Sequence, residues 1–345
     1  MTNSALRTRW ETGQGRRTVA AIMAALLSGH RPVEVGFPNL DRRVDLRGIV
    51  VPEPEALRHW AGMGMGRVLE RVGESLNLGA IRLSWVHLGD SYLPHLRLAS
   101  AVVADCRFDQ ATLPDLRSTE TRFERCAFNG ADLGDAVFGP GTRFVGCDFS
   151  GARLRKVSAD CAAFSGCEFG DATIADCDFN HTVFDRCHFA GALSDVRFRA
   201  ESMAVDPALG RTARPDPDCL RDCDLGAARL EEVSFDQLLL KRVRLPSAGA
   251  QLLLPDLRCV LLAVRQDAAS AGGRIGAQRL ATRAEHELRW LPRGRDWGHL
   301  NLDDIRRGLP AAEGEFAVEM VERALATCAE RPPGLLGRLF GRHPA

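Results

Sequence analysis

Residues 121–151 read TRFERCAFNGADLGDAVFGPGTRFVGCDFSG, and a large apolar residue recurs in this stretch at every fifth position. The same five-residue step runs over 78–189 and again over 220–245. One extra residue between Phe138 and Phe144 is the only shift of phase within the first run. Of the 29 positions on this step all but one are apolar, whereas a hydrophobic fraction of 45% would give about 13 by chance. The pattern therefore describes a long internal repeat.

A five-residue step excludes an α-helix for this region. Successive apolar residues of a helix would be rotated by about 140°, so no buried stripe would form. In an extended chain, residues two apart share a face, so each unit supplies an inward pair and leaves two residues to turn a corner. The repeat therefore predicts short straight segments joined by tight bends.

A second, longer period gives the number of sides. The motif Cys-x-Phe recurs at intervals of 20, 21, 20 and 20 residues, and the interval of 21 contains the extra residue. Twenty residues are four units of five, so equivalent residues should stack in a four-sided coil, roughly 4.8 Å apart along its axis. The structural core ladder expected from this motif consists of Cys106, Phe108, Cys126, Phe128, Cys147, Phe149, Cys167, Phe169, Cys187 and Phe189.

This pattern resembles that of the pentapeptide repeat proteins, whose motif is a small residue, a polar residue, Leu or Phe, and two turn residues. Residues 131–135, 147–151 and 177–181 match this motif well. The resemblance implies an all-β repeat solenoid, the right-handed four-sided (quadrilateral) β-helix, here with α-helical N- and C-terminal segments. It specifies the fold more closely than the function, because this rod serves many roles.

The chain divides into three parts by pattern. We expect an N-terminal helical cap over 1–75, a β-helix over 76–250 and a C-terminal helical region over 251–345. The five-residue phase is lost over 199–217, which contains three prolines, so this segment should be a loop that leaves the rod.

Apolar residues at helical spacing predict a helix over 19–27, and a second helix is expected over 53–73. Between them, 44–48 reads as an isolated early repeat. Near the other end, Gly272 and Gly273 suggest a boundary before a helical stretch over 276–330.

The eleven cysteines do not form a metal-site pattern. The close pairs Cys219/Cys223 and Cys161/Cys167 lack zinc spacing and a histidine partner, and no export signal argues for a disulfide framework. We therefore expect buried, reduced thiols that fill small spaces in the core, with neither metal nor cofactor.

Catalytic motifs are also missing. Residues 286–290 begin like a zinc-protease helix but end in Trp, and the glycine-rich segment 62–66 lacks the lysine of a phosphate-binding loop. The sequence thus indicates a protein that is not an enzyme, because no group of side chains supplies nucleophile, base and electrophile.

Composition restricts the partners. Lys plus Arg equals 45 and Asp plus Glu equals 45, so no net field attracts the chain to nucleic acid. The longest apolar run, 19–27, is too short to span a bilayer. We expect a cytoplasmic protein that binds neither nucleic acid directly nor a membrane.

Two functions remain open. The first is a non-enzymatic protein-protein interaction scaffold or adaptor whose partner is another protein of unknown identity. The second, implied by the resemblance, is a DNA-mimicking binder of DNA gyrase or topoisomerase that protects against gyrase inhibitors, as in antibiotic self-resistance. The resemblance further implies a homodimer through the C-terminal helical region.

Charge along the repeat tests the second function. Residues 76–198 contain 16 acidic and 12 basic side chains, whereas DNA of comparable length, roughly 29 Å, has about 17 negative charges. Mimicry therefore requires the acids to gather on one side. The candidate outward acidic contacts are Asp132, Asp148, Glu168 and Asp178.

Overall fold

The computed structural model describes residues 3–15, 17–18, 39–50, 77–202, 205–206, 211–212, 215–240, 242–246, 251–254, 256–291 and 298–329. The chain separates into two units, Met1–Pro246 and Ser247–Ala345. The helices expected over 19–27 and 53–73 lie outside the described residues.

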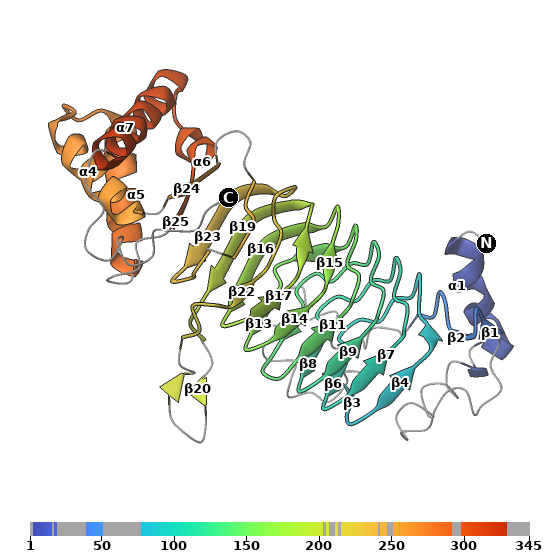
Figure 1. Ribbon diagram of the computed structural model, residues 1–345. Coiled ribbons are helices and arrows are strands. Elements are labelled where there is room, and N and C mark those ends of the chain that lie inside the picture. Colours follow the sequence, from blue (N-terminus) through green and yellow to red (C-terminus); the bar gives the residue numbers. More distant parts are fainter. Residues whose placement is uncertain are drawn as a thin grey trace. The chain divides into compact units, whose positions relative to one another are not determined.

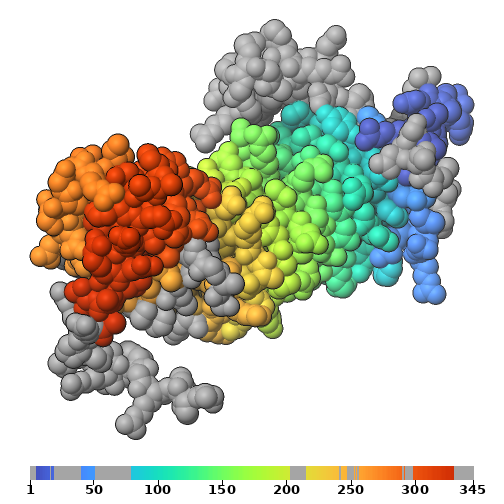
Figure 2. All heavy atoms as spheres, turned by 90° about the horizontal axis from the view of Figure 1, so that it is seen from above, coloured from blue at the N-terminus to red at the C-terminus, as the bar shows by residue number. Residues whose placement is uncertain are grey.

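The repeat region is a four-sided β-helix of parallel strands, which confirms the predicted fold class (Figure 1). The first face consists of β3 (Asn77–Leu78), β6 (Arg97–Ala99), β8 (Arg117–Thr119), β10 (Val137–Phe138), β13 (Ser158–Asp160), β16 (Thr173–Asn180), β19 (Ala192–Arg199) and β23 (Arg229–Asp236). The second face consists of β4 (Arg82–Ser84), β7 (Val102–Ala104), β9 (Arg122–Glu124), β11 (Arg143–Val145), β14 (Ala163–Ser165), β17 (Val183–Asp185) and β22 (Leu220–Arg221). Successive coils appear as adjoining bands of colour in Figure 2.

The other two faces are joined by shorter pairings. The third face contains β5 (Val86–His87), β15 (Glu168–Phe169) and β18 (His188–Phe189). In the other coils of this face, isolated β-bridges join one residue to its register partner in the next coil. The fourth face contains β12 (Arg153–Arg155), which pairs with the first half of β16. β16, β19 and β23 run through the corner between the fourth and the first face, so these strands belong to both.

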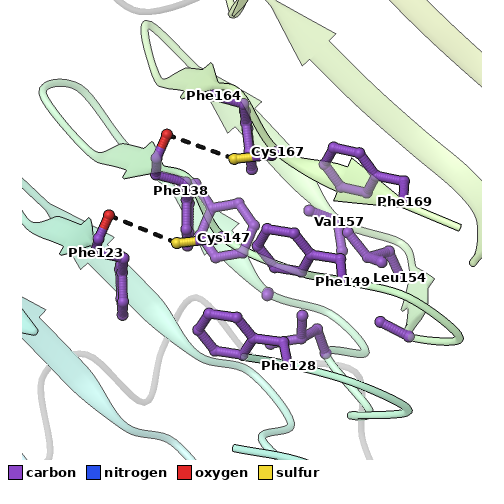
Figure 3. Close-up of a cluster of buried hydrophobic side chains, with 14 of the residues drawn as sticks. Phe123, Phe128, Phe138, Cys147, Phe149, Leu154, Val157, Phe164, Cys167 and Phe169 are labelled. Atoms are coloured by element: carbon purple, nitrogen blue, oxygen red, sulfur yellow. Dashed lines mark hydrogen bonds between the residues drawn. The ribbon is translucent and has the colours of Figure 1, made fainter. Parts of the chain in front are cut away.

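The core is a set of stacked rings and small side chains (Figure 3). Phe128 and Phe149 on the third face have ring centroids 4.9 Å apart and planes inclined by 4°. Rings from adjacent faces meet edge to face, as Phe144 and Phe149 do at 5.5 Å. Both arrangements suit aromatic quadrupoles, and the strand spacing imposes the first.

The corners explain the two turn residues of each unit. The second residue after each inward apolar residue has a positive φ at nearly every corner, for example 57° at Asp90 and 59° at Asp135. This left-handed conformation favours Gly, Asn and Asp, and Gly and Asp supply many of the corners. The extra residue of the long coil is absorbed at such a corner, where Gly141 has a φ of 76°.

Ser118 is the polar exception on the five-residue step, and the structure explains it. Its side chain is 2% exposed, and its hydroxyl lies 3.1 Å from that of Thr142 in the next coil. The Thr142 hydroxyl also donates to the Ser118 carbonyl at 2.9 Å. Each buried hydroxyl therefore has a partner, as burial requires.

The N-terminal segment adds a further coil. β2 (Arg43–Asp45) pairs in parallel with β5 and antiparallel with β1 (Asn39–Leu40). The segment 44–50, which the sequence pattern assigned to the N-terminal region, is thus stacked on the β-helix. α1 (Asn3–Glu11) packs on this coil through Leu6 and Trp10, which are 2% and 8% exposed.

The loop expected over 199–217 begins later than predicted, because β19 continues to Arg199. It contains an antiparallel hairpin of β20 (Val205–Asp206) and β21 (Arg211–Thr212), and β20 projects away from the rod in Figure 1. Its end returns to the rod where the Asp216 amide donates to the Ala200 carbonyl at 3.0 Å.

The C-terminal unit is mainly helical, as expected, with α4 (Leu257–Ser270), α5 (Ile275–Trp290), α6 (Leu302–Arg306) and α7 (Ala311–Ala329). Gly272 and Gly273 form the turn between α4 and α5 and mark no domain boundary. A two-stranded sheet of β24 (Gln251–Leu254) and β25 (Gly298–Asn301) was not predicted. Among the residues that the structure describes, no helix combines the length and hydropathy that a membrane span requires.

Candidate protein-binding faces

The core ladder lies along the inner wall of the third face. Its thiols and rings are at most 4% exposed, and Cys223 extends the row by one coil. Each thiol donates to a carbonyl of the preceding coil, such as Cys147 to Phe123 at 3.6 Å and Cys167 to Phe144 at 3.6 Å (Figure 3). These side chains fill space, since none reaches the surface.

The protonation states of Cys106 in this ladder and of Cys177 in β16 fit a structural role. Burial raises the pKa of the Cys106 thiol, and the hydrogen bond with Cys126 adds to the effect. Burial likewise raises the pKa of Cys177 to about 12. A protonated thiol is neither a nucleophile nor a metal ligand. In the described part of the chain, no three His, Cys, Asp or Glu side chains are arranged to hold a metal ion.

Two cysteines of the C-terminal unit depart from the expectation of reduced thiols. Cys259 and Cys328 form a disulfide. The expectation was wrong for this pair because it treated every cysteine as part of the repeat, although these two lie in a helical unit without that repeat.

The four candidate acidic contacts do not share one side of the rod. Asp132 lies on the fourth face, Asp178 on the first, and Asp148 and Glu168 are register neighbours on the third. The structure therefore brings together only two of the four.

Most of these carboxylates are paired with a base in the next coil. Asp132 lies 3.2 Å from Arg153, Glu168 lies 3.1 Å from His188, and Asp178 lies 3.5 Å from Arg197. Other pairs follow the same rule, with the acid one coil before its base: Asp105 and Arg125, Asp222 and Arg242, Asp224 and Arg244. Much of the surface charge is thus compensated along the axis.

The third face contains a row of ionisable side chains at register positions, Asp148, Glu168, His188 and Asp224, which we call the acidic strip, and Arg244 follows it in the next coil. The Asp148 carboxylate accepts hydrogen bonds from the Ser150 amide at 2.9 Å and hydroxyl at 2.6 Å. The Gly226 amide at 2.8 Å, together with Arg244, holds the pKa of Asp224 below its ordinary value.

The column beside the acidic strip has small side chains. It consists of Ser150, Gly170, Ala190 and Gly226. These residues add little side-chain bulk of their own beside the strip, although the Arg244 guanidinium lies against Gly226.

Asp224 was missed in the sequence because the loop places it 36 residues after His188 instead of 20, and His188 was missed because only acidic residues were taken as contacts. A signal was present, since Cys223-Asp224-Leu225 repeats Cys147-Asp148-Phe149.

Comparisons with known proteins agree with the repeat pattern. A family model described as pentapeptide repeats, with eight copies, matches residues 141–171. No curated protein matches the chain significantly.

Two solved structures similar to the chain are described here. HetL, a pentapeptide repeat protein involved in heterocyst differentiation regulation from the cyanobacterium Nostoc, is 13% identical with a TM-score of 0.21, over 63% of this chain and 95% of HetL. Full-length QnrB1, a plasmid-mediated fluoroquinolone resistance protein, is 12% identical with a TM-score of 0.21, over 59% of this chain and 92% of QnrB1.

Proposed function

This chain is a pentapeptide repeat protein, and we propose that it acts without catalysis, as a scaffold or adaptor that binds another protein through the outer faces of its β-helix. One observation supports this most. The inward positions of the repeat are occupied by stacked rings and small side chains, whereas the outward positions form regular, flat faces. Such a rod offers area for contact in place of a substrate site.

The acidic strip is the contact surface that we propose on the third face. Its side chains are spaced by one coil, roughly 4.8 Å. A protein partner with basic side chains in a row would match this spacing. Rim charges of this kind mainly set orientation and association rate.

The second candidate is the DNA-mimicking binder of DNA gyrase or topoisomerase. Asp148 and Glu168 favour it, because they are neighbouring carboxylates on one face and a mimic needs carboxylates in a row. Duplex DNA, however, has one negative charge per 1.7 Å. In this rod Asp132, Glu168 and Asp178 each face a neighbouring base. We therefore rank mimicry second.

Three further points belong to the same proposal. The hairpin of β20 and β21 supplies a second contact beside the faces. The C-terminal helical region mediates a homodimer. The protein works in the cytoplasm, where a disulfide such as Cys259–Cys328 is rare and usually redox-sensitive.

The experiment uses the full chain as bait in an extract of its native host. We expect a partner that binds the wild type, is lost with the double variant Asp148→Asn/Glu168→Gln, and is retained with the control Asp135→Asn at a corner outside the strip. Retention by the double variant would remove the acidic strip from the proposal. Protection of gyrase supercoiling from an inhibitor by equimolar protein would favour the second candidate over the first.

A further inference from the structure

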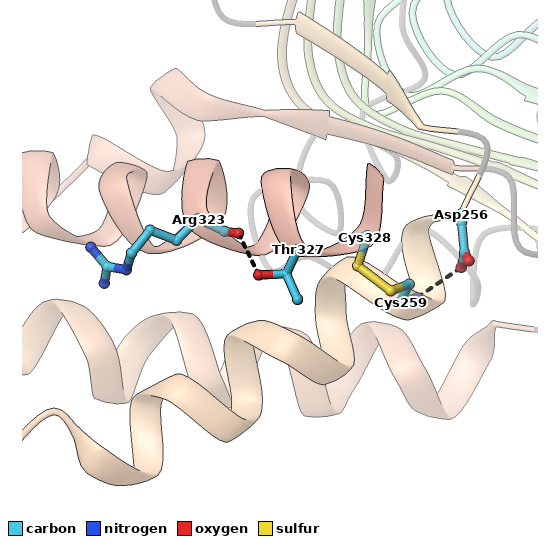
Figure 4. The surroundings of a disulfide bond; sticks show 5 residues. All are labelled: Asp256, Cys259, Arg323, Thr327 and Cys328. Atoms are coloured by element: carbon cyan, nitrogen blue, oxygen red, sulfur yellow. Dashed lines mark hydrogen bonds between the residues drawn. A yellow bond between two sulfur atoms is a disulfide. The ribbon is translucent and has the colours of Figure 1, made fainter. Parts of the chain in front are cut away.

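The C-terminal unit contains a covalent link between two of its helices. Cys259 lies in the first turn of α4 and Cys328 in the last turn of α7, with Cα atoms 6.0 Å apart across the disulfide (Figure 4). The two cysteines are 69 positions apart, a span that includes most of the described helices of the unit. We propose that this pair is a thiol–disulfide exchange site at which a dithiol reductant sets the stability of the C-terminal unit.

Exposure distinguishes the two cysteine residues. Cys259 is 8% exposed, whereas Cys328 is half-buried between the exposed Thr327 and Ala329. An incoming thiolate therefore meets the sulfur of Cys328 first. Attack there forms a mixed disulfide with Cys328 and releases Cys259 as a thiolate, which takes a proton from water.

The second thiol of the reductant completes the exchange. It attacks the reductant's own sulfur in the mixed disulfide, forms the disulfide of the reductant and releases the Cys328 thiolate, which is protonated in turn. Two electrons pass to the protein, and the reductant is oxidised from dithiol to disulfide. A small-molecule disulfide oxidant reverses the reaction.

The surroundings of Cys259 have opposing effects on its thiolate. Its amide donates to the Asp256 carboxylate at 2.8 Å, where that carboxylate caps the N-terminus of α4. The free amides of a helix N-terminus favour a thiolate, whereas the negative charge of Asp256 opposes it. The rate of thiol–disulfide exchange at this site therefore depends more on access to Cys328 than on stabilisation of the Cys259 thiolate.

The disulfide matters because α4 and α7 share one small core. Val260 and Val264 of α4 belong to the same buried cluster as Val318 and Val321 of α7. Closing a loop of this length shifts the unfolding equilibrium constant by about a thousandfold in the chain-entropy treatment. That factor is a large share of the stability of a unit of this size. Reduction therefore turns a stable unit into one that opens readily.

The β-helix should not respond to the same reductant. Its six stacked thiols are at most 2% exposed, each in contact with a carbonyl: Cys106, Cys126, Cys147, Cys167, Cys187 and Cys223. Cys161 is half-buried, and its thiol lies 3.4 Å from the Ser202 hydroxyl. Reduction thus acts on one unit and leaves the other unchanged.

The test compares the full chain before and after treatment with dithiothreitol. We expect titration of the denatured protein to rise from nine free thiols to eleven. Hydrogen exchange at the amides of Val260 and Val321 should accelerate by up to about a thousandfold. Hydrogen exchange at the amides of Phe164 and Phe184 in the β-helix should stay unchanged.

Variants make the assignment specific. Cys328→Ser should show the exchange pattern of the reduced protein without reductant, and the control Cys161→Ser should behave as wild type. If Cys328→Ser does not fold, the comparison of oxidised and reduced wild type decides. Eleven free thiols in the protein before treatment, or unchanged exchange in α4 and α7 after complete reduction, would overturn the proposal.

Discussion

Phe144 stacks on Phe164, with ring centroids 4.7 Å apart and planes inclined by 7°. The two residues are register partners on β11 and β14, so the spacing of the parallel strands fixes the distance between the rings. Phe184 continues the stack 4.8 Å beyond Phe164. Because backbone hydrogen bonds hold the coils apart, the neighbours of a missing ring cannot close the gap.

Phe164→Ala should therefore lower the free energy of unfolding of the β-helix by about 3–5 kcal/mol, the range for aromatic truncation in cores that do not collapse. Denaturant unfolding followed by circular dichroism measures it. Val183→Ala on the outer surface of the second face is the control and should stay within about 0.5 kcal/mol of wild type. A loss below about 1 kcal/mol for Phe164→Ala would show that the coils do relax.

Much of the β-helix could be predicted because each coil repeats the one before it in register. The positions of Leu, Phe and Cys in the repeat are then the buried positions of the core. One residue inserted at a corner does not change which positions are buried. Ser118 shows the limit of this argument. Its partner Thr142 belongs to a different position of the repeat, and only the stacked coils show that the two hydroxyls meet.

The binding surface was less predictable. The five-residue step shows which side chains point outward. The face on which each one lies follows only from the 20-residue period, which was not applied to the acidic residues. Asp132 and Asp178 were therefore grouped with Asp148. Which basic side chain pairs with each of these acids depends on the side-chain conformations of residues in neighbouring coils. In the helical unit, no repeat relates Cys259 to Cys328, so their pairing follows only from the packing of α4 against α7.

Acid should weaken the β-helix at Asp115. Burial opposes ionisation of this carboxyl, but hydrogen bonds from His95 at 2.8 Å and Arg97 at 2.6 Å outweigh it and hold its pKa at about 2. The unfolded chain takes up this proton near pH 3.8. The stabilisation, about 1–2 kcal/mol after screening, is thus complete above pH 3.8 and is lost as the pH falls through 2.

Urea unfolding of Asp115→Asn and wild type between pH 5 and 2 measures this contribution. The difference between the two proteins should shrink toward the acid end of the range. A difference that stays constant with pH would mean that the carboxylate contributes through its shape and not through its charge.

The C-terminal unit should weaken in a higher pH range. Burial, with a smaller contribution from Arg283, lowers the pKa of His299 on β25 to about 4, against 6.5 in the unfolded chain. The unfolded chain therefore binds a proton between these values that the folded unit excludes. Its free energy of unfolding should fall as the pH drops from 6.5 to 4, by up to about 3 kcal/mol.

His299→Gln should flatten that pH dependence, and hydrogen exchange in α4 resolves this unit from the β-helix. His286 on the exposed side of α5 offers the matched control, because His286→Gln should leave the dependence in place. Equal pH profiles for all three proteins would show that another group accounts for the acid sensitivity.

We expect the β-helix to tolerate removal of the loop. Ser202 is anchored by its hydroxyl to Asp160 at 2.7 Å, and the Asp216 amide bonds to the Ala200 carbonyl at 3.0 Å, so the two ends of the loop lie close together. Replacing 203–214 by a short Gly-Ser linker should keep the β-sheet circular dichroism signal. The free energy of unfolding should stay within about 0.5 kcal/mol of wild type, since surface loops tolerate such changes. If the hairpin of β20 and β21 contacts the partner, the same deletion should abolish or weaken binding by at least tenfold in a titration with purified partner. Full binding by the shortened protein would assign recognition to the faces of the β-helix alone, whereas loss of the sheet signal would show that the hairpin supports the fold.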